Sequence, residues 1–291
     1  MSPSGFRLTP ARHTARYPGA SSQRVAPGGT QTRMPSFTAA DGVQIAYDDT
    51  GPTGSPPLLL IHGFSSNRQE AWKRTGWYAS LAQRGQRLIA LDLRGHGESG
   101  KPHDPATYGR DVLLGDITSL LDSLGVEWAN VFGYSMGARL ALSLAIHEKE
   151  RVGYLILGGV GGAFFDPPPP GEPMAQAMEA ASPDSITEPM LKSFRHFADE
   201  QGEDRLALAA FTRGRGDPVA RDDVRSVSAP TLVVAGSRDE LAGDPHGLSD
   251  LIRGAKAVTL MGCDHFNAIP HGLLKATVFD FLDGYLDETL P

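Results

Sequence analysis

The chain has 291 residues, of which 40% are hydrophobic and 21% charged, and its formal net charge is −7 at pH 7. The acidic balance argues against nucleic acid as the main partner, because phosphate binding needs clustered Lys and Arg. No apolar run approaches the roughly 18 residues that a membrane-spanning helix needs. The single cysteine cannot form an internal disulfide, which favours a reducing compartment such as the cytoplasm.

The first 34 residues differ from the rest of the chain. They contain five arginines and no acidic residue, lack apolar periodicity and are interrupted by four prolines. An Arg-rich, acid-poor start is compatible with a transit peptide, whereas the lack of an apolar segment argues against a secretory signal. The composition favours a disordered tail, or a start codon set too early with Met34 as the true start. We expect the folded domain to occupy residues 35–291.

From residue 37 onward, apolar runs typical of strands alternate with helical stretches. Residues 37–39 and 43–47 flank Asp41-Gly42 and predict a β-hairpin. The later strand candidates are Leu58–Ile61, Leu88–Leu91, 130–133, 154–158, 231–235 and 257–261. Short continuous apolar strands are typical of a parallel sheet that is covered on both faces.

Helical stretches lie between these strand candidates. They are residues 77–84, 112–124, Met136–His147 and 273–286. In the last of them apolar residues recur at steps of four and three, which matches the helical period of 3.6. The alternation predicts a three-layer α/β domain with a mostly parallel central sheet.

Residues 161–223 interrupt the alternation, because they contain no strand-like run. The segment carries Asp166 and four consecutive prolines, followed by helix-compatible stretches at 174–181, 189–198 and 204–212. It is too long for an ordinary loop. We interpret it as a helical cap inserted between two strands, over the edge of the sheet where open α/β sheets bind ligands.

Residues 133–137 read Gly-Tyr-Ser-Met-Gly, a Gly-x-Ser-x-Gly pattern. The pattern follows an apolar run and precedes an Ala/Leu-rich helical stretch, which is the strand–turn–helix context of a nucleophile elbow. The tight, strained turn requires small flanking residues. Ser135 is therefore the candidate nucleophile, with its hydroxyl close to a helix N-terminus.

A serine nucleophile needs a base that is oriented by a third group. Of the nine histidines, His265 is the candidate base, since it lies between the last strand candidate and the last helix. Asp239 is the candidate acid, because it follows a strand candidate and lies between Ser135 and His265 in chain order.

Three other carboxylates lie near these candidates in the sequence or in chain order. Asp244 and Asp166 are the alternatives for the acid. Asp264 is next to the candidate base in sequence, so its side chain should point elsewhere.

The oxyanion formed during acyl transfer needs two backbone donors. Met136 directly follows the nucleophile and can supply one N–H group. Phe64 follows the apolar run Leu58–Ile61, and its N–H is our candidate for the other. His62, in the same turn, is expected to brace the loop rather than to transfer protons.

Five motifs occur in one order along the chain: residues 61–64 (Ile-His-Gly-Phe), 92–99 (Asp-Leu-Arg-Gly-His-Gly-Glu-Ser), 133–137, 236–239 (Gly-Ser-Arg-Asp) and 262–266 (Gly-Cys-Asp-His-Phe). With them the chain resembles the α/β-hydrolase fold family, in the branch of bacterial esterases, lactonases and lipase-like enzymes. The resemblance covers about residues 37–287. It is specific for the superfamily and much less so for one reaction.

The resemblance implies a catalytic triad of Ser135, Asp239 and His265, with oxyanion donors at Phe64 and Met136. It implies a structural role for the turn at 92–99 and a helical cap at the insertion. Epoxide hydrolases and haloalkane dehalogenases of the family carry aspartate where this chain has serine, so those activities are disfavoured. Prolyl iminopeptidase-like members carry tryptophan at the position of Met136, which counts against peptide cleavage.

No cofactor or metal site is predicted, because the lone Cys263 has no ligand partners at metal-binding spacing. Phe164 and Phe165, at the start of the insertion, are candidates for an apolar substrate pocket, with cap-to-core packing as the alternative. Phe194, Phe197 and Phe211 are further candidates for this pocket.

The sequence thus predicts a serine hydrolase that cleaves a small-molecule ester, thioester or lactone through an acyl-enzyme. Carbon–carbon bond hydrolysis or perhydrolysis on the same triad is one alternative. A ligand receptor built on a hydrolase scaffold is another. Neither the oligomeric state nor the natural substrate follows from the sequence.

Overall fold

The computed structural model describes residues 35–165, 171–214, 216 and 218–286. The expectations for the N-terminal tail, Met34 and Asp166 lie outside these residues. None of the described helices is both long enough and apolar enough to cross a membrane.

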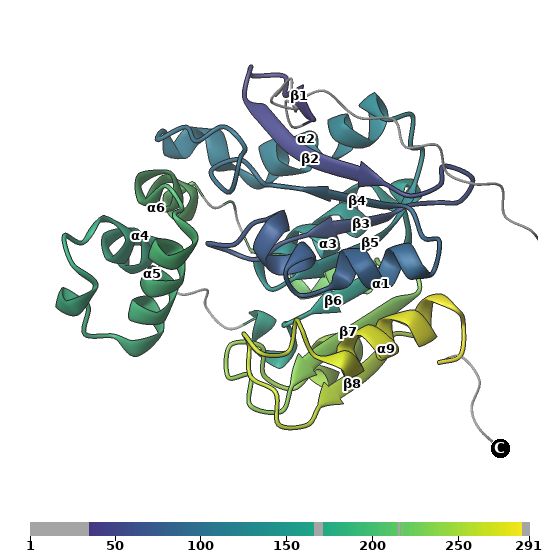
Figure 1. The fold of residues 1–291 in the computed structure, drawn as a ribbon. Helices are drawn as coiled ribbons and strands as arrows, with labels where there is room; N and C mark the ends of the chain where they lie inside the picture. The colour runs from purple at the N-terminus through teal and green to yellow at the C-terminus, as the bar shows by residue number, and fades with distance from the viewer. Residues whose placement is uncertain (1–34, 166–170, 215, 217, 287–291) are drawn as a thin grey trace, which may run out of the picture. The chain divides into compact units, whose positions relative to one another are not determined.

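The described residues form an eight-stranded sheet with the order β1-β2-β4-β3-β5-β6-β7-β8 (Figure 1). The strands are β1 (Ser36–Thr38), β2 (Gln44–Thr50), β3 (Leu58–Ile61), β4 (Leu88–Leu91), β5 (Ala129–Tyr134), β6 (Val152–Gly158), β7 (Thr231–Gly236) and β8 (Lys256–Leu260). The hairpin strands β1 and β2 are antiparallel, and every pairing from β4 to β8 is parallel. The predicted strands and hairpin are therefore present.

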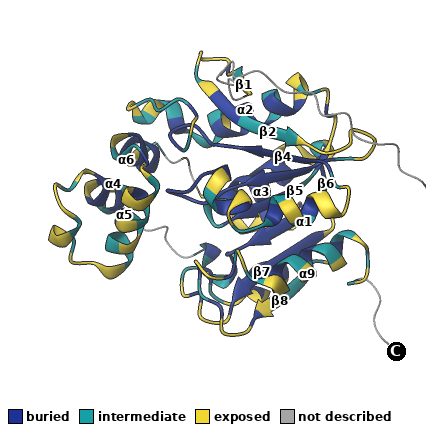
Figure 2. Ribbon diagram, in the orientation of Figure 1, coloured by how far each residue is buried: buried dark blue, intermediate teal, exposed yellow. Residues whose placement is uncertain are grey.

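Alternating side chains of the central strands pack into two separate apolar cores. In β3, Leu58 and Leu60 belong to one core, whereas Leu59 and Ile61 belong to the other. Helices α1 (Trp77–Gln83) and α9 (Gly272–Leu282) cover the first face, and α2 (Arg110–Ser123) and α3 (Met136–His147) cover the second. Figure 2 shows the central strands buried between these helices. Burial on both faces explains the continuous apolar runs, and the three-layer α/β fold is confirmed.

Several short elements were not predicted. They are the π-helix η1 (Gln69–Lys73), the 3₁₀ turns η2 (Pro105–Tyr108), η3 (Lys149–Arg151), η4 (Gly162–Phe165) and η5 (Pro183–Ser185), and the helices α7 (Arg221–Arg225) and α8 (His246–Ser249). Each has five residues or fewer, which is too short to show a period in sequence.

The segment between β6 and β7 folds as three longer helices, which we call the helical insertion (residues 161–223): α4 (Gly171–Glu179), α5 (Pro189–Gln201) and α6 (Arg205–Arg213). No strand occurs among its described residues. Side-chain caps explain where two helices begin. Glu188 accepts hydrogen bonds from the first turn of α5, and Asp204 accepts them from the first turn of α6. Gly202, with φ 68°, ends α5 in the left-handed conformation.

The corner between α5 and α6 is attached to the body by a buried carboxylate. Glu203 accepts hydrogen bonds from Asn67 Nδ2 and from the Gly97 backbone N–H, each at 2.8 Å. The adjacent Asp204 contacts His103 Nε2 at 3.0 Å. Asn67 lies three residues beyond Phe64, so the corner is tied to the loop that carries a predicted oxyanion donor.

The turn at 92–99 is held by buried ion pairs. Arg94, 1% exposed, binds both Asp116 and Asp41. The hydrogen bond from Arg94 lowers the pKa of Asp41. Arg68 pairs with Asp92 at the first residue of the turn. These contacts join the hairpin, α2 and the turn, as a structural role for residues 92–99 requires.

Two helical glycines should respond oppositely to alanine substitution. An added Cβ at Gly115 in α2 meets nothing within 4 Å, whereas one at Gly137 in α3 lies 2.1 Å from the Ile61 carbonyl oxygen. We expect Gly115→Ala to raise the free energy of unfolding by about 0.5–1 kcal/mol. Gly137→Ala should lower it severely or prevent folding, because backbone must move. Urea denaturation measures both variants, and equal effects would contradict this account.

Glu203 should give the stability a specific pH dependence. Burial raises the pKa of Glu203 above its ordinary value of 4.5, against the opposing effect of its two hydrogen bonds. A group with a raised folded-state pKa stabilises the fold most when protonated, so its contribution falls as the pH rises through that pKa. We expect the free energy of unfolding of the wild type, minus that of Glu203→Gln, to decrease between about pH 4 and about pH 7.

Glu179→Gln is the control for this measurement. Hydrogen bonds from Arg213 lower the pKa of Glu179, so the corresponding difference should increase over the same pH range. A Glu203 difference that does not change with pH, or that increases, would show that this carboxylate is not destabilised by burial.

Candidate active site

Ser135 stands in a strained turn between β5 and α3. Its backbone has φ 55° and ψ −113°, a left-handed conformation that is rare for a residue with a side chain. Its N–H donates to the Gly158 carbonyl at 2.7 Å. A Cβ on Gly133 would lie 2.1 Å from the Gly137 carbonyl oxygen. Gly133 is therefore required by its close contact with the backbone of Gly137. Gly137 is required by its close contact with the backbone of Ile61 in β3.

The structure brings Ser135, His265 and Asp239 into one hydrogen-bonded chain. His265 Nε2 lies 2.8 Å from Ser135 Oγ. His265 Nδ1 lies 2.9 Å and 2.8 Å from the two carboxylate oxygens of Asp239. Both His265 and Asp239 are buried, and Asp239 also accepts a hydrogen bond from the Ala242 N–H. The imidazole therefore lies between a hydroxyl and a fixed carboxylate.

The loops after β7 and β8 bring the acid and the base together. A Cβ on Gly236, the last residue of β7, would lie 2.2 Å from the Cys263 carbonyl oxygen, so only glycine allows this approach. The Arg238 N–H donates to the same carbonyl at 2.9 Å. Asp239 and His265 thus extend from two loops that are bonded to each other.

Tyr134 is a positioning residue that the sequence analysis did not identify. Its hydroxyl donates a 2.7 Å hydrogen bond to the His265 carbonyl oxygen. Burial raises the pKa of Tyr134 well above its ordinary value, so the phenol stays a donor. The residue directly before Ser135 in the pentapeptide therefore fixes the loop of the base. Its polar tip at the end of a mostly apolar strand was the available signal.

The other carboxylates point elsewhere. Asp264 accepts hydrogen bonds from the backbone of Phe266 and Asn267, so it stabilises its own turn. Asp244 accepts from the His246 N–H at 3.0 Å.

The backbone N–H groups of Phe64 and Met136 lie on the two segments that meet at Ser135. Met136 is the first residue of α3, so its N–H has no acceptor within the helix. The turn that carries Phe64 passes the elbow closely, since a Cβ on Gly63 would lie 3.5 Å from Ser135 Cβ. Neither N–H makes a hydrogen bond among the described residues.

Two buried histidines support the Phe64 turn. His62 Nε2 accepts a hydrogen bond from the Leu93 N–H, and its Nδ1 donates to the Gly63 carbonyl. Burial lowers the pKa of His62, which fits a neutral ring in this bracing arrangement. His96 packs against the ring of Phe64, and burial lowers its pKa well below the ordinary value. Both imidazoles are buried, and the two hydrogen bonds of His62 agree with the bracing role expected for it.

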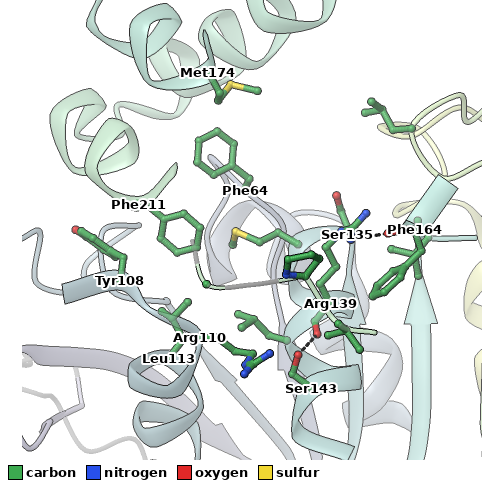
Figure 3. A pocket seen from close by; sticks show the side chains of 18 of the residues that line it. Phe64, Tyr108, Arg110, Leu113, Ser135, Arg139, Ser143, Phe164, Met174 and Phe211 are labelled. Atoms are coloured by element: carbon green, nitrogen blue, oxygen red, sulfur yellow. Dashed lines mark hydrogen bonds between the residues drawn. The ribbon is translucent and has the colours of Figure 1, made fainter. Parts of the chain in front are cut away.

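Two cavities meet at the Ser135–His265 pair. The larger has a volume of about 240 Å³ and the smaller about 180 Å³, and Phe64, Ser135, Phe194 and His265 line both. Figure 3 shows the larger cavity, with Ser135 at its wall and Met174 of α4 on the side of the insertion. Side chains of the insertion therefore form part of the wall of the cavity that contains the candidate nucleophile.

The phenylalanines proposed for the pocket differ in which cavity they line. Phe164 and Phe211 line the larger cavity, and Phe197 lines the smaller. Phe165 lines neither; its ring packs against Phe164 and lies 4.2 Å from the Arg221 guanidinium. The expectation of a pocket role for Phe165 does not agree with this position, because adjacent residues of η4 point in different directions.

Within the described residues, no group of three or more His, Cys, Asp or Glu side chains is arranged to hold a metal ion.

Comparison with known proteins places this chain in a family. Residues 56–199 match the model of the alpha/beta hydrolase fold. The chain is 30% identical over 270 residues to 2-hydroxymuconate semialdehyde hydrolase from Pseudomonas sp. (strain CF600), covering 84% of this chain and 92% of that protein. It is 36% identical over 118 residues to epoxide hydrolase 4 from Mus musculus, but this match covers 40% of this chain and only 31% of that protein.

A solved structure of similar fold is a hydrolase from Pseudomonas aeruginosa PA01, with 26% sequence identity and a TM-score of 0.67. The similarity covers 87% of this chain and 99% of that one. The near-complete match to the semialdehyde hydrolase, the family model and the shared fold agree with each other. The chain belongs to the α/β-hydrolase family, and it is a hydrolase of that superfamily.

Proposed function

We propose that the protein is a serine hydrolase that cleaves a small ester, thioester or lactone through an acyl-enzyme. The observation that carries the proposal is the chain Ser135–His265–Asp239, with a 2.8 Å contact between His265 Nε2 and Ser135 Oγ. Nucleophile and base lie within hydrogen-bond distance, and the base is oriented by a carboxylate.

In the acylation step, Ser135 Oγ attacks the carbonyl carbon of the substrate. Nε2 of His265 accepts the hydroxyl proton, and the imidazolium that forms is stabilised by Asp239. Because Nδ1 of His265 is hydrogen-bonded to the carboxylate, the neutral ring keeps its proton on Nδ1 and its lone pair on Nε2. Collapse of the tetrahedral intermediate transfers the Nε2 proton to the leaving oxygen or sulfur.

In the deacylation step, water takes the place of the leaving group. His265 accepts a proton from the water as it attacks the acyl carbon, and returns the proton to Ser135 Oγ. The carboxylic acid is released and the starting protonation state is restored. In a lactone the leaving alcohol stays part of the same product.

We assign the backbone N–H groups of Phe64 and Met136 as the donors that stabilise the negative charge on the carbonyl oxygen. Preorganised donors at the position where charge develops make a large contribution to catalysis. Two features support this assignment: Met136 begins α3, and Gly63 lies against Ser135 Cβ. Tight bracing of the turn by His62 would keep the Phe64 donor in place.

Carbon–carbon bond hydrolysis is the second candidate. It is favoured by the 30% identity to a 2-hydroxymuconate semialdehyde hydrolase over nearly that protein's whole length. The same serine and histidine would serve, but the leaving group would be a carbanion that must be protonated at carbon. Perhydrolysis would differ only in that hydrogen peroxide replaces water in deacylation. A receptor would instead retain its ligand with slow turnover.

A substrate panel separates these activities. It contains p-nitrophenyl esters of increasing acyl length, lactones, a vinylogous β-diketone, and an ester assayed with and without peroxide. Rapid hydrolysis of esters or lactones supports the proposal. Turnover of the diketone alone would favour the carbon–carbon hydrolase, and tight binding with negligible turnover of every compound would favour the receptor.

Ser135→Ala should fold like the wild type, because it removes one small hydroxyl. It should abolish labelling by a fluorophosphonate probe and lower the turnover number by several orders of magnitude. Mass spectrometry of the labelled protein locates the modified residue. Labelling that persists on another serine would refute the assignment of Ser135.

Asp239→Asn keeps the size of the side chain but can present an N–H donor where His265 needs an acceptor. We expect turnover near neutral pH to fall by up to about 10⁴-fold. Asp244→Asn is the matched control, since among the described residues the Asp244 carboxylate bonds only within its own loop, and it should retain activity. Circular dichroism checks the folding of both variants; equal activities would remove Asp239 from the mechanism.

A further inference from the structure

The described residues on the wall of the larger cavity include positively charged side chains and no Asp or Glu. Apart from Ser135 and His265, its polar lining side chains are Tyr108, Arg110, Arg139 and Ser143, and no Asp or Glu is among the described residues that line it. The Tyr108 hydroxyl donates to the Pro102 carbonyl, and Ser143 Oγ donates to the Arg139 carbonyl. Among the described lining residues, the two guanidinium groups are thus the permanently charged side chains.

Arg139 has a structural role in this wall. Its Nη1 donates to the Phe164 carbonyl at 3.1 Å, and its guanidinium lies 4.3 Å from the centre of the Phe164 ring. These contacts hold Phe164 at the edge of the cavity. Arg139 also adds positive potential to a partly apolar space, where charges interact more strongly than in water.

Arg110 is different, because its protein contacts are weak. Among the described residues its one ion pair joins Nε to an Asp111 carboxylate oxygen at 3.5 Å. The Asp111 side chain is 90% exposed, and an exposed ion pair of this kind contributes little to stability. The Arg110 side chain is only 30% exposed, and Figure 3 shows it at the cavity on the α2 side. Its two Nη groups thus remain available to a ligand.

We propose that Arg110 binds a carboxylate carried by the part of the substrate that occupies the larger cavity. The inference rests on the proposed hydrolase function, and it narrows the substrate class to monoanionic esters, thioesters or lactones. A guanidinium pairs with a carboxylate through two parallel hydrogen bonds, which gives orientation as well as affinity.

The kinetic test compares charged and neutral substrates of the same length. The probes are mono-p-nitrophenyl glutarate and adipate, their methyl esters, and aryl acetates that carry the carboxylate on the alcohol side. We expect the wild type to prefer a carboxylated ester over its neutral partner by about tenfold or more in kcat/KM. Arg110→Gln should lose most of this preference, and Arg110→Lys should keep part of it.

Arg221→Gln is the matched control. It removes the same charge from an exposed residue that stacks on Phe165 and does not line the cavity. It should leave the preference unchanged. A preference that survives in Arg110→Gln, or that is lost equally in Arg221→Gln, would overturn the assignment of Arg110.

A binding measurement separates failure of this inference from failure of the proposed function. Glutarate and adipate are titrated calorimetrically into the wild type and Arg110→Gln, with glutaramide as the neutral control. Weaker dicarboxylate binding by about tenfold or more in the variant supports the site even without ester turnover. Absence of binding to the wild type, or equal binding to both proteins, refutes it. Ester hydrolysis with no charge preference would refute the carboxylate site alone.

Discussion

The contact between α3 and β3 constrains the whole site. Gly137 places the first turn of α3 against the Ile61 carbonyl, so near that a methyl group would overlap it. This closeness forces the chain to turn sharply at Ser135, which accepts a φ of 55° as a result. The cost of that conformation is balanced by burial on both faces of the sheet. The serine hydroxyl is therefore held out of the core by backbone packing, independently of the residues that it contacts.

The remaining groups reach Ser135 because the strands between β4 and β8 are parallel. Phe64 follows β3, Asp239 follows β7 and His265 follows β8, and the carboxyl ends of parallel strands meet at one edge of the sheet. Bonds between the loops then set the distances: Arg238 to Cys263, and Tyr134 to His265. The pairing of the parallel strands thus places the loops at one edge of the sheet. A few hydrogen bonds between the loops then align their side chains.

Local patterns carried most of what could be predicted from sequence. Apolar runs located the strands, and a glycine-flanked serine after such a run located the elbow. Tyr134 was missed because its role depends on the face of β5 from which it points, and Glu203 was missed because its partners lie 136 and 106 residues away. Phe165 was assigned to the pocket with its neighbour, although a 3₁₀ turn directs consecutive side chains apart. Such errors arise where function depends on direction or on distant partners rather than on local periodicity.

The attachment of Glu203 to Asn67 and Gly97 restricts how this family member can diversify. An insertion of different helices could be exchanged by recombination to change substrate choice, since its helix caps are local. The exchanged segment would still have to present an acceptor at the α5–α6 corner. Without one, the amide of Asn67 and the N–H of Gly97 would be left buried and unbonded. Residues at the α5–α6 corner are therefore constrained by their contacts with the body, and residues away from that corner are freer to change.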